Sequence, residues 1–381
     1  MNSIGEFQCS LDLNLLVLRL LRSLLRARPI HKNRVHEQFP KSPADKYGMT
    51  RPRPVFAGDT IHIQRRTRDG RFFLVPHRET LQLVKYAYAV AANKFKLKIH
   101  ALCVMSTHVH VIATDPLAQH PDFTASAHRI IALGLKEMYG IEGSVWRGGG
   151  VSVQRLVGRD AIIESLAYVR LNPVAAGCVG TERAYPGVYG ADDRDPLAET
   201  AETIARPACF GEESVLPDEA VFRLTQPPLV VEELGKEKAA REIAEAVERH
   251  RKDAQNQRKT AKRRFFGMKR VLATDIWTRS GELKRTRLNP TYKGVIARAI
   301  QLAHQTYQAF LYAYQLAMGA FKEGQRDTVF PAGTYRMRLL GCEVARTSAF
   351  LEAEKRKVNK AEAKKSARRW LAGSTPNQKS A

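Results

Sequence analysis

The chain has 381 residues, enough for two or three domains, and its apolar fraction of 44% is ordinary for a globular protein. Its 62 lysines and arginines exceed its 38 acidic residues and leave a net charge of +24, which favours a polyanionic partner because neutralised phosphates release counterions. Its five cysteines form no C-x-x-C pair, which argues against a disulfide framework or a cysteine zinc site and fits a reducing cytoplasm.

Residues 1–48 differ in character from the rest of the chain. The stretch from Leu11 to Leu25 is rich in leucine, but it carries Asp12, Arg19 and Arg22 and is too short to span a bilayer. It suits a poor signal segment or an amphipathic helix. We favour a third interpretation, in which translation starts at Met49 and residues 1–48 are a non-native or disordered extension, and we expect no membrane partner.

Residues 49–190 are expected to form one compact domain of alternating strands and helices. Apolar spacing predicts strands over 58–66, 97–105, 108–114 and 151–156, and helices over 79–94, 123–139 and 161–171. The last helix is expected to end at Asn172-Pro173. The order β-α-β-β-α-β followed by a helix predicts an α+β fold, with an antiparallel sheet and helices on one face.

The chain after residue 190 divides by charge. Residues 191–235 are acidic and contain prolines, so we expect a linker, whereas residues 236–381 are basic and expected to be mainly helical, with helices over 295–321 and 355–369. Between Arg249 and Arg270 there are ten lysines and arginines and one acidic residue. This stretch suits either an auxiliary DNA-binding surface or a solvated helical face. The candidate contacts are Arg263, Arg264, Lys269 and Arg270, with Phe265 and Phe266 for stacking on unpaired bases.

The triplet His108-Val109-His110 stands in the second of two consecutive predicted strands. Side chains alternate between the faces of a strand, so both imidazoles point the same way and lie about 7 Å apart, close enough to converge on one divalent ion. Two surface histidines on an edge strand would give the same pattern. The triplet alone is therefore a weak signal.

Tyr168 and Asn172 strengthen the signal of the histidine triplet. They are four residues apart in a predicted helix and therefore share one of its faces. The amide oxygen of Asn172 would suit a hard cation such as Mg²⁺ or Mn²⁺. The alternative is a core tyrosine, with Asn172 at the helix end before Pro173.

The histidine triplet after an apolar strand, together with the run Tyr168 to Gly177 (Y-V-R-L-N-P-V-A-A-G), resembles the REP-associated tyrosine transposases, which belong to the single-tyrosine HUH transposases. The resemblance covers about residues 50–190 and implies a ferredoxin-like palm. It also implies that His108 and His110 bind the divalent metal. Tyr168 would attack single-stranded DNA beside a hairpin and leave a 5′-phosphotyrosine and a free 3′-OH. Asn172 stands where the family places a polar third ligand.

We therefore expect a metal-dependent single-stranded DNA endonuclease and strand transferase. It would use Mg²⁺ or Mn²⁺, act on hairpin-forming repeats as a monomer or homodimer, and work in the cytoplasm at the nucleoid. The alternative is a domesticated, catalytically inactive DNA-binding protein on the same fold.

Two other enzyme classes fit poorly. A two-histidine RNA phosphoesterase needs two H-x-T/S motifs on strands, but the sequence has only His304-Gln305-Thr306, in a predicted helix. A tyrosine recombinase needs an Arg…His-x-x-Arg…Tyr arrangement. The matches, at His31 to Arg34 and His62 to Arg65, lie far upstream of Tyr168.

Overall fold

The computed structural model describes residues 52–192, 194–281 and 291–345. Internal contacts divide the chain into a larger unit, which holds residues 55–300, and a smaller unit, which holds residues 301–352 and the segment before residue 55. The predicted extension over residues 1–48 and the predicted basic helix over 355–369 lie outside the described residues.

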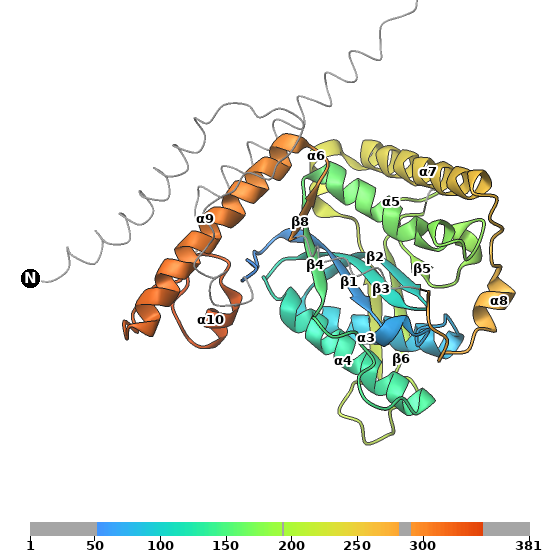
Figure 1. Cartoon of the computed structure of the whole chain (residues 1–381), viewed down its shortest axis with the longest axis horizontal. Coiled ribbons are helices and arrows are strands. Elements are labelled where there is room, and N and C mark those ends of the chain that lie inside the picture. The colour runs from blue at the N-terminus through green and yellow to red at the C-terminus, as the bar shows by residue number, and fades with distance from the viewer. Residues whose placement is uncertain (1–51, 193, 282–290, 346–381) are drawn as a thin grey trace, which may run out of the picture. The chain divides into compact units, whose positions relative to one another are not determined.

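The larger unit contains a sheet and the helices that cover it (Figure 1). Its strands are β1 (Asp59–Arg66), β2 (Lys98–Met105), β3 (His108–Asp115), β4 (Ser152–Val157), β5 (Val188–Tyr189), β6 (Thr200–Ala205), β7 (Glu219–Leu224) and β8 (Tyr292–Gly294). Its helices are α3 (Arg78–Phe95), α4 (His120–Tyr139), α5 (Arg159–Ala175), α6 (Pro228–Leu234), α7 (Lys236–Thr260) and α8 (Met268–Leu272). Short 3-10 turns occur at η1 (Arg68–Gly70) and η2 (Glu182–Ala184).

The strand order in the sheet is β6-β7-β2-β3-β1-β4-β8, and β5 also pairs with β2. The central strands β2, β3, β1 and β4 pair antiparallel, whereas β7 joins β2 and β8 joins β4 in parallel. The predicted α+β class is confirmed. The predicted strands over 58–66, 97–105, 108–114 and 151–156 correspond to β1 to β4, and the helices over 79–94 and 123–139 to α3 and α4.

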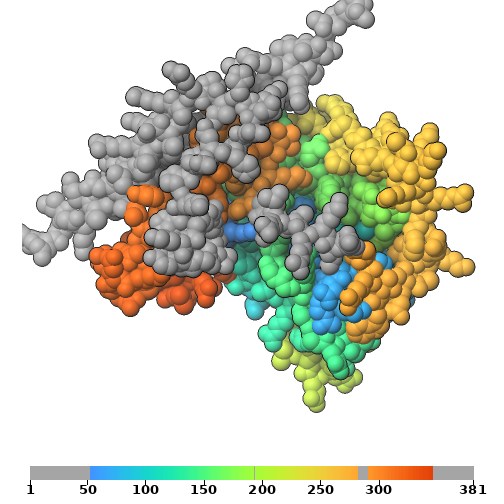
Figure 2. All heavy atoms as spheres, viewed as in Figure 1, coloured from blue at the N-terminus to red at the C-terminus, as the bar shows by residue number. Residues whose placement is uncertain are grey.

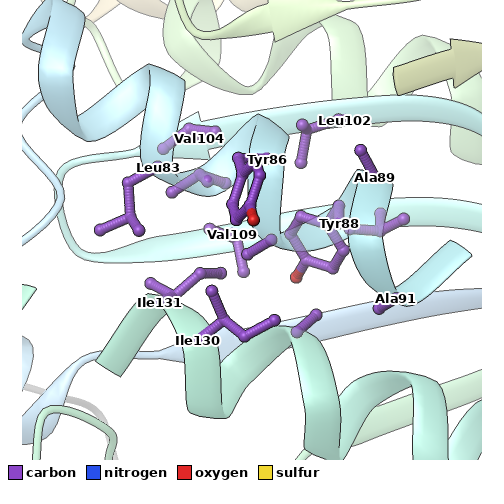
Figure 3. Packing of buried hydrophobic residues seen from close by; sticks show 14 of the residues in the cluster. Leu83, Tyr86, Tyr88, Ala89, Ala91, Leu102, Val104, Val109, Ile130 and Ile131 are labelled. Carbon is purple, nitrogen blue, oxygen red and sulfur yellow. The ribbon is translucent and has the colours of Figure 1, made fainter. Parts of the chain in front are cut away.

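One face of the sheet is packed against α3 and α4 and forms a hydrophobic core. Figure 3 shows this packing, with Leu83 and Tyr86 of α3 and Ile131 of α4 over Val109 of β3, all of them buried. These residues recur every three or four positions on the helices and every second position on the strands, so each element contributes one apolar face. The two helices of the β-α-β-β-α-β unit lie on one face, as predicted.

Helix α5 covers the opposite face of the sheet. Its buried residues Ile162, Leu166 and Val169 pack with Cys103 and Ile112 of the strands in a second core, to which α7 also contributes. The prediction that this helix ends at Asn172 is wrong, because α5 continues through Pro173 to Ala175. Backbone hydrogen bonds from Ala176 to Asn172 and from Cys178 to Pro173, both 2.9 Å, complete the last turn.

The predicted linker over residues 191–235 contains the hairpin β6–β7, which extends the sheet beyond β2. Along β7, Ala220, Phe222 and Leu224 are buried while Glu219 and Arg223 are exposed. This alternation gives the strand one apolar face despite its acidic surroundings. Charge composition therefore concealed a strand pair that belongs to the first core.

Helix α9 (Ala297–Lys322) begins in the larger unit and continues from residue 301 in the smaller unit. It matches the helix predicted over 295–321. The short helix α10 (Tyr335–Leu339) follows it in the smaller unit. Tyr314 and Phe321 of α9 pack around the buried Phe330. His304 lies in α9, so the H-x-T match is helical, as expected. No helix in the described ranges is long and apolar enough to cross a membrane.

Candidate active site

The pairing of β1 with β3 places a row of polar side chains beneath α5. Gln64 lies opposite His110 and Arg66 lies opposite His108 in the antiparallel register. Paired residues share a face of the sheet, and so do residues two apart on one strand, so His62 belongs to the same row. The apolar residues between them on both strands point into the first core.

Tyr168 of α5 lies over this row. Its ring centroid is 5.6 Å from that of His110, with the ring planes at 89°, and 6.0 Å from that of His62. Tyr168 is 39% exposed, whereas His110 is 1% exposed. A solvent-accessible phenol therefore lies against a buried imidazole.

Asn172 connects α5 to both histidines of the triplet. Its Nδ2 is 3.3 Å from Nε2 of His110, and its side chain also forms a hydrogen bond with His108. The two side chains on α5 thus share a face, as their spacing of four residues predicts. The structure brings together the four side chains that the sequence motifs single out.

Each histidine has a second partner that fixes its ring. Nδ1 of His108 is 2.9 Å from Oγ1 of Thr107, and Nδ1 of His110 is 2.9 Å from Nε2 of His62. When a histidine binds a metal through one ring nitrogen, a partner at the other nitrogen sets the tautomer and the ring orientation. Thr107 and His62 occupy those second positions, which leaves Nε2 as the remaining nitrogen of each ring.

Burial keeps the three imidazoles neutral. It lowers the pKa of His108 to about 4, with a further contribution from the charge of Arg66. It lowers the pKa of His62 to about 3, with the charge of Lys293 next in importance, and holds the pKa of His110 well below its usual value. A neutral imidazole keeps the lone pair that a metal ion requires.

The donor set that this arrangement offers is two imidazoles and one amide. In the described part of the chain, no three His, Cys, Asp or Glu residues are grouped to hold a metal, so the substrate or water would supply the other ligands. Asn172 turns its nitrogen toward His110, and rotation of the amide would present its oxygen instead. Neutral nitrogens with an amide oxygen fit a divalent cation that binds a phosphate.

An open pocket of about 480 Å³ lies beside Tyr168. The residues that line it are His62, Gln64, Gln154, Tyr168, Tyr292, Lys293, Gly294 and Ile300. Three of them, Tyr292, Lys293 and Gly294, form β8, a strand from the basic region that no sequence motif links to the site. A three-residue strand that joins a sheet in parallel has no local sequence pattern, so β8 could not be predicted. The alternation H-I-Q on β1, by contrast, indicates that His62 and Gln64 share the polar face of the sheet.

The basic candidates Arg263, Arg264, Lys269 and Arg270 lie away from this pocket. All four are exposed, the first two in the loop after α7 and the last two on α8. Figure 2 shows side chains of this gold-coloured stretch projecting from the surface. A backbone hydrogen bond of 2.9 Å from Phe266 to Gly177 connects the stretch to the end of α5.

The two phenylalanines of this stretch differ. Phe265 is half-buried against the second core, and the guanidinium of Arg258 lies 5.1 Å from its ring centroid. Phe266 is 43% exposed, with the guanidinium of Arg270 at 4.4 Å. Phe266 is therefore the more exposed of the two rings, and Arg270 lies over one of its faces.

Comparison of the chain with protein-family models and with curated proteins gives no match. Among solved structures, it is similar to a REP-associated tyrosine transposase bound to a REP hairpin, with 20% identity and a TM-score of 0.31 over 39% of this chain and 84% of that chain. It is also similar to a protein assigned as a transposase from Deinococcus radiodurans R1, with 20% identity and a TM-score of 0.24 over 32% of this chain and 95% of that chain. Both solved structures are thus described as transposases.

Proposed function

We propose that the chain is a metal-dependent single-stranded DNA endonuclease and strand transferase, a transposase whose nucleophile is Tyr168. One observation carries this proposal: the exposed phenol of Tyr168 lies against the buried imidazole of His110. His110 and the half-buried His108 both contact the side chain of Asn172, and burial keeps both imidazoles neutral. A phosphodiester that reaches this phenol would lie over the donors that can hold a cation.

In the proposed step, the phenol oxygen of Tyr168 forms a bond to phosphorus while the bond from phosphorus to the 3′ oxygen breaks. The phenol loses its proton and the departing 3′ oxygen gains one, which yields a 5′-phosphotyrosine and a free 3′-OH. The phosphodiester energy is retained in the new bond. Attack by a second 3′-OH then reverses the step and joins strands.

His108, His110 and Asn172 would hold the cation, and His62 and Thr107 would keep the two imidazoles oriented. A bound Mg²⁺ or Mn²⁺ would supply a Lewis acid for a phosphoryl oxygen and offset charge in the transition state. The low pKa of each histidine keeps the nitrogens unprotonated for this purpose at neutral pH.

The exposed lysine and arginines of α8 and the preceding loop would bind phosphates of the DNA strand away from the scissile bond. Replacing Arg263, Arg264, Lys269 and Arg270 with glutamine should weaken binding and flatten its dependence on salt, because each lost phosphate contact lowers the slope by about 0.7 for single strands. An unchanged slope, measured by fluorescence anisotropy between low and high salt, would assign DNA binding to another surface.

The proposal is tested by incubating the protein with a panel of hairpin-flanked single-stranded oligonucleotides and Mg²⁺ or Mn²⁺, followed by a denaturing gel. We expect a covalent protein–DNA band that EDTA removes and Tyr168→Phe abolishes. Tyr292→Phe is the matched control, because Tyr292 lines the same pocket. DNA binding without any covalent band would favour the domesticated, inactive alternative.

A further inference from the structure

Lys293 enters the site from outside the part of the chain that resembles the transposases. Strand β8 pairs in parallel with β4, so that Lys293 lies opposite Leu156 and Tyr292 opposite Arg155. Figure 1 shows β8 alongside β4, close to α5. A short strand from the basic region thus brings a cation to the helix that carries Tyr168.

The side chain of Lys293 is held in a defined position. Its Nζ donates a hydrogen bond to Oγ of Ser165 at 3.0 Å and lies 5.6 Å from the ring centroid of Tyr168. Ser165, Tyr168 and Asn172 are three and four residues apart, so they follow one another along one face of α5. The ammonium of Lys293 therefore lies on one side of Tyr168 along this face, and the histidine pair with Asn172 lies on the other.

The described lining of the pocket does not match the charge of this ammonium. In the part of the chain that the structure describes, no acidic residue lines the pocket. Glu164, the acidic group that favours the charged form of Lys293, is bonded to Arg249 at 2.5 Å and to His250 at 2.8 Å. Burial lowers the pKa of Lys293, so the charged form would be stabilised by an anion entering the pocket.

We propose that Lys293 binds the scissile phosphate of the DNA strand from the side opposite the histidine pair and neutralises its charge as Tyr168 attacks. The inference rests on the proposed function, because it names a second phosphate contact in the same site. An ammonium in a partly desolvated pocket stabilises developing phosphoryl charge more than it would in water, and the bond to Ser165 places it before the substrate arrives.

The test compares Lys293→Met, Lys293→Arg and wild type on two oligonucleotides, one with the natural scissile phosphodiester and one with a methylphosphonate there, which lacks the charge. Lys293→Met should slow covalent-complex formation on the phosphodiester by about 10²-fold, the size found for loss of one electrostatic donor. The loss on the methylphosphonate should be several-fold smaller, and Lys293→Arg should recover part of the rate. Arg298→Met is the matched control, since exposed Arg298 loses the same charge five residues away.

A second measurement applies even if the methylphosphonate reacts too slowly. In a Tyr168→Phe background, Lys293→Met should reduce the salt slope of DNA binding by about 0.7, the value for one phosphate contact on a single strand. An unchanged slope, an equal loss of rate on both oligonucleotides, or no loss would each overturn the inference and leave Lys293 as an anchor of β8. Wild type that forms no covalent complex would overturn the proposed function and this inference together, whereas the other outcomes leave the proposed function intact.

Discussion

The two faces of the central sheet are built by the same strands and differ in polarity. Along β1, Ile61 and Ile63 point into the hydrophobic core beneath α3 and α4, while His62 and Gln64 point to the pocket beneath α5. Along β3, Val109 lies in the same core between the two histidines of the triplet. Alternation along a strand thus lets adjacent residues serve stability on one face and, in the proposed function, chemistry on the other.

This difference predicts that neighbouring substitutions on one strand have separable effects. Residues on the apolar face should change the free energy of unfolding and leave the chemistry of the folded molecules intact. Residues on the polar face should change the reaction with little effect on folding. Ile63 and His62 are neighbours on β1 and point to opposite faces, so substitutions at these two positions compare the faces within one strand.

The largest effect is expected for Ile63→Ala. Ile63 is fully buried in the first core, and removal of a buried isoleucine side chain to alanine costs about 2–5 kcal/mol. Urea unfolding should show this loss, while the rate of covalent-complex formation per folded molecule should stay near the wild-type rate. A loss of rate without a loss of stability would mean that the two faces are not separable at this position.

His62→Ala should show the reverse pattern. His62 lies 2.9 Å from Nδ1 of His110, so its removal frees the ring of His110 to change tautomer and orientation. Loss of such a partner typically costs about 10–100-fold in metal affinity or activity. Titration of Mn²⁺ against covalent-complex formation should therefore require more metal, with an unfolding free energy close to wild type. Unchanged metal dependence would contradict the role given to His62.

The smallest effect concerns a titratable group on the apolar side. Burial lowers the pKa of His128 to about 3, and its Nε2 is 3.0 Å from the hydroxyl of Tyr88. The folded state keeps this ring neutral, whereas the unfolded state gains a proton as pH falls through 6.5. The contribution of His128 to the free energy of unfolding is fully present above pH 6.5. It declines as pH falls from 6.5 toward about 3.

Between pH 7.5 and 5.0 the decline should reach about 1–2 kcal/mol for this group. Urea unfolding at the two pH values measures it, and His128→Gln should show a smaller difference between them. An equal pH dependence in the variant would assign the acid sensitivity to other histidines. His62 and His110 are the first candidates, because burial lowers the pKa of His62 to about 3 and holds the pKa of His110 well below its usual value.

The part of the site predictable from sequence is the part set by local spacing. His108 and His110 share a face because they are two apart on a strand, and Tyr168 and Asn172 because they are four apart on a helix. Lys293 depends on the pairing of β8 with β4, between segments more than 130 residues apart, and no local pattern encodes that pairing. The strands β6 and β7 differ from β8 in this respect. An alternation of buried and exposed residues is present along β7, but the acidic composition around the two strands favours a linker.

The most direct test of the central claim is to identify the residue that carries the DNA. After covalent-complex formation, nuclease trimming and trypsin digestion, mass spectrometry should find a nucleotide attached to Tyr168 in the peptide Asp160–Arg170. Attachment to Tyr292, or cleaved DNA with no adduct on any peptide, would contradict the account.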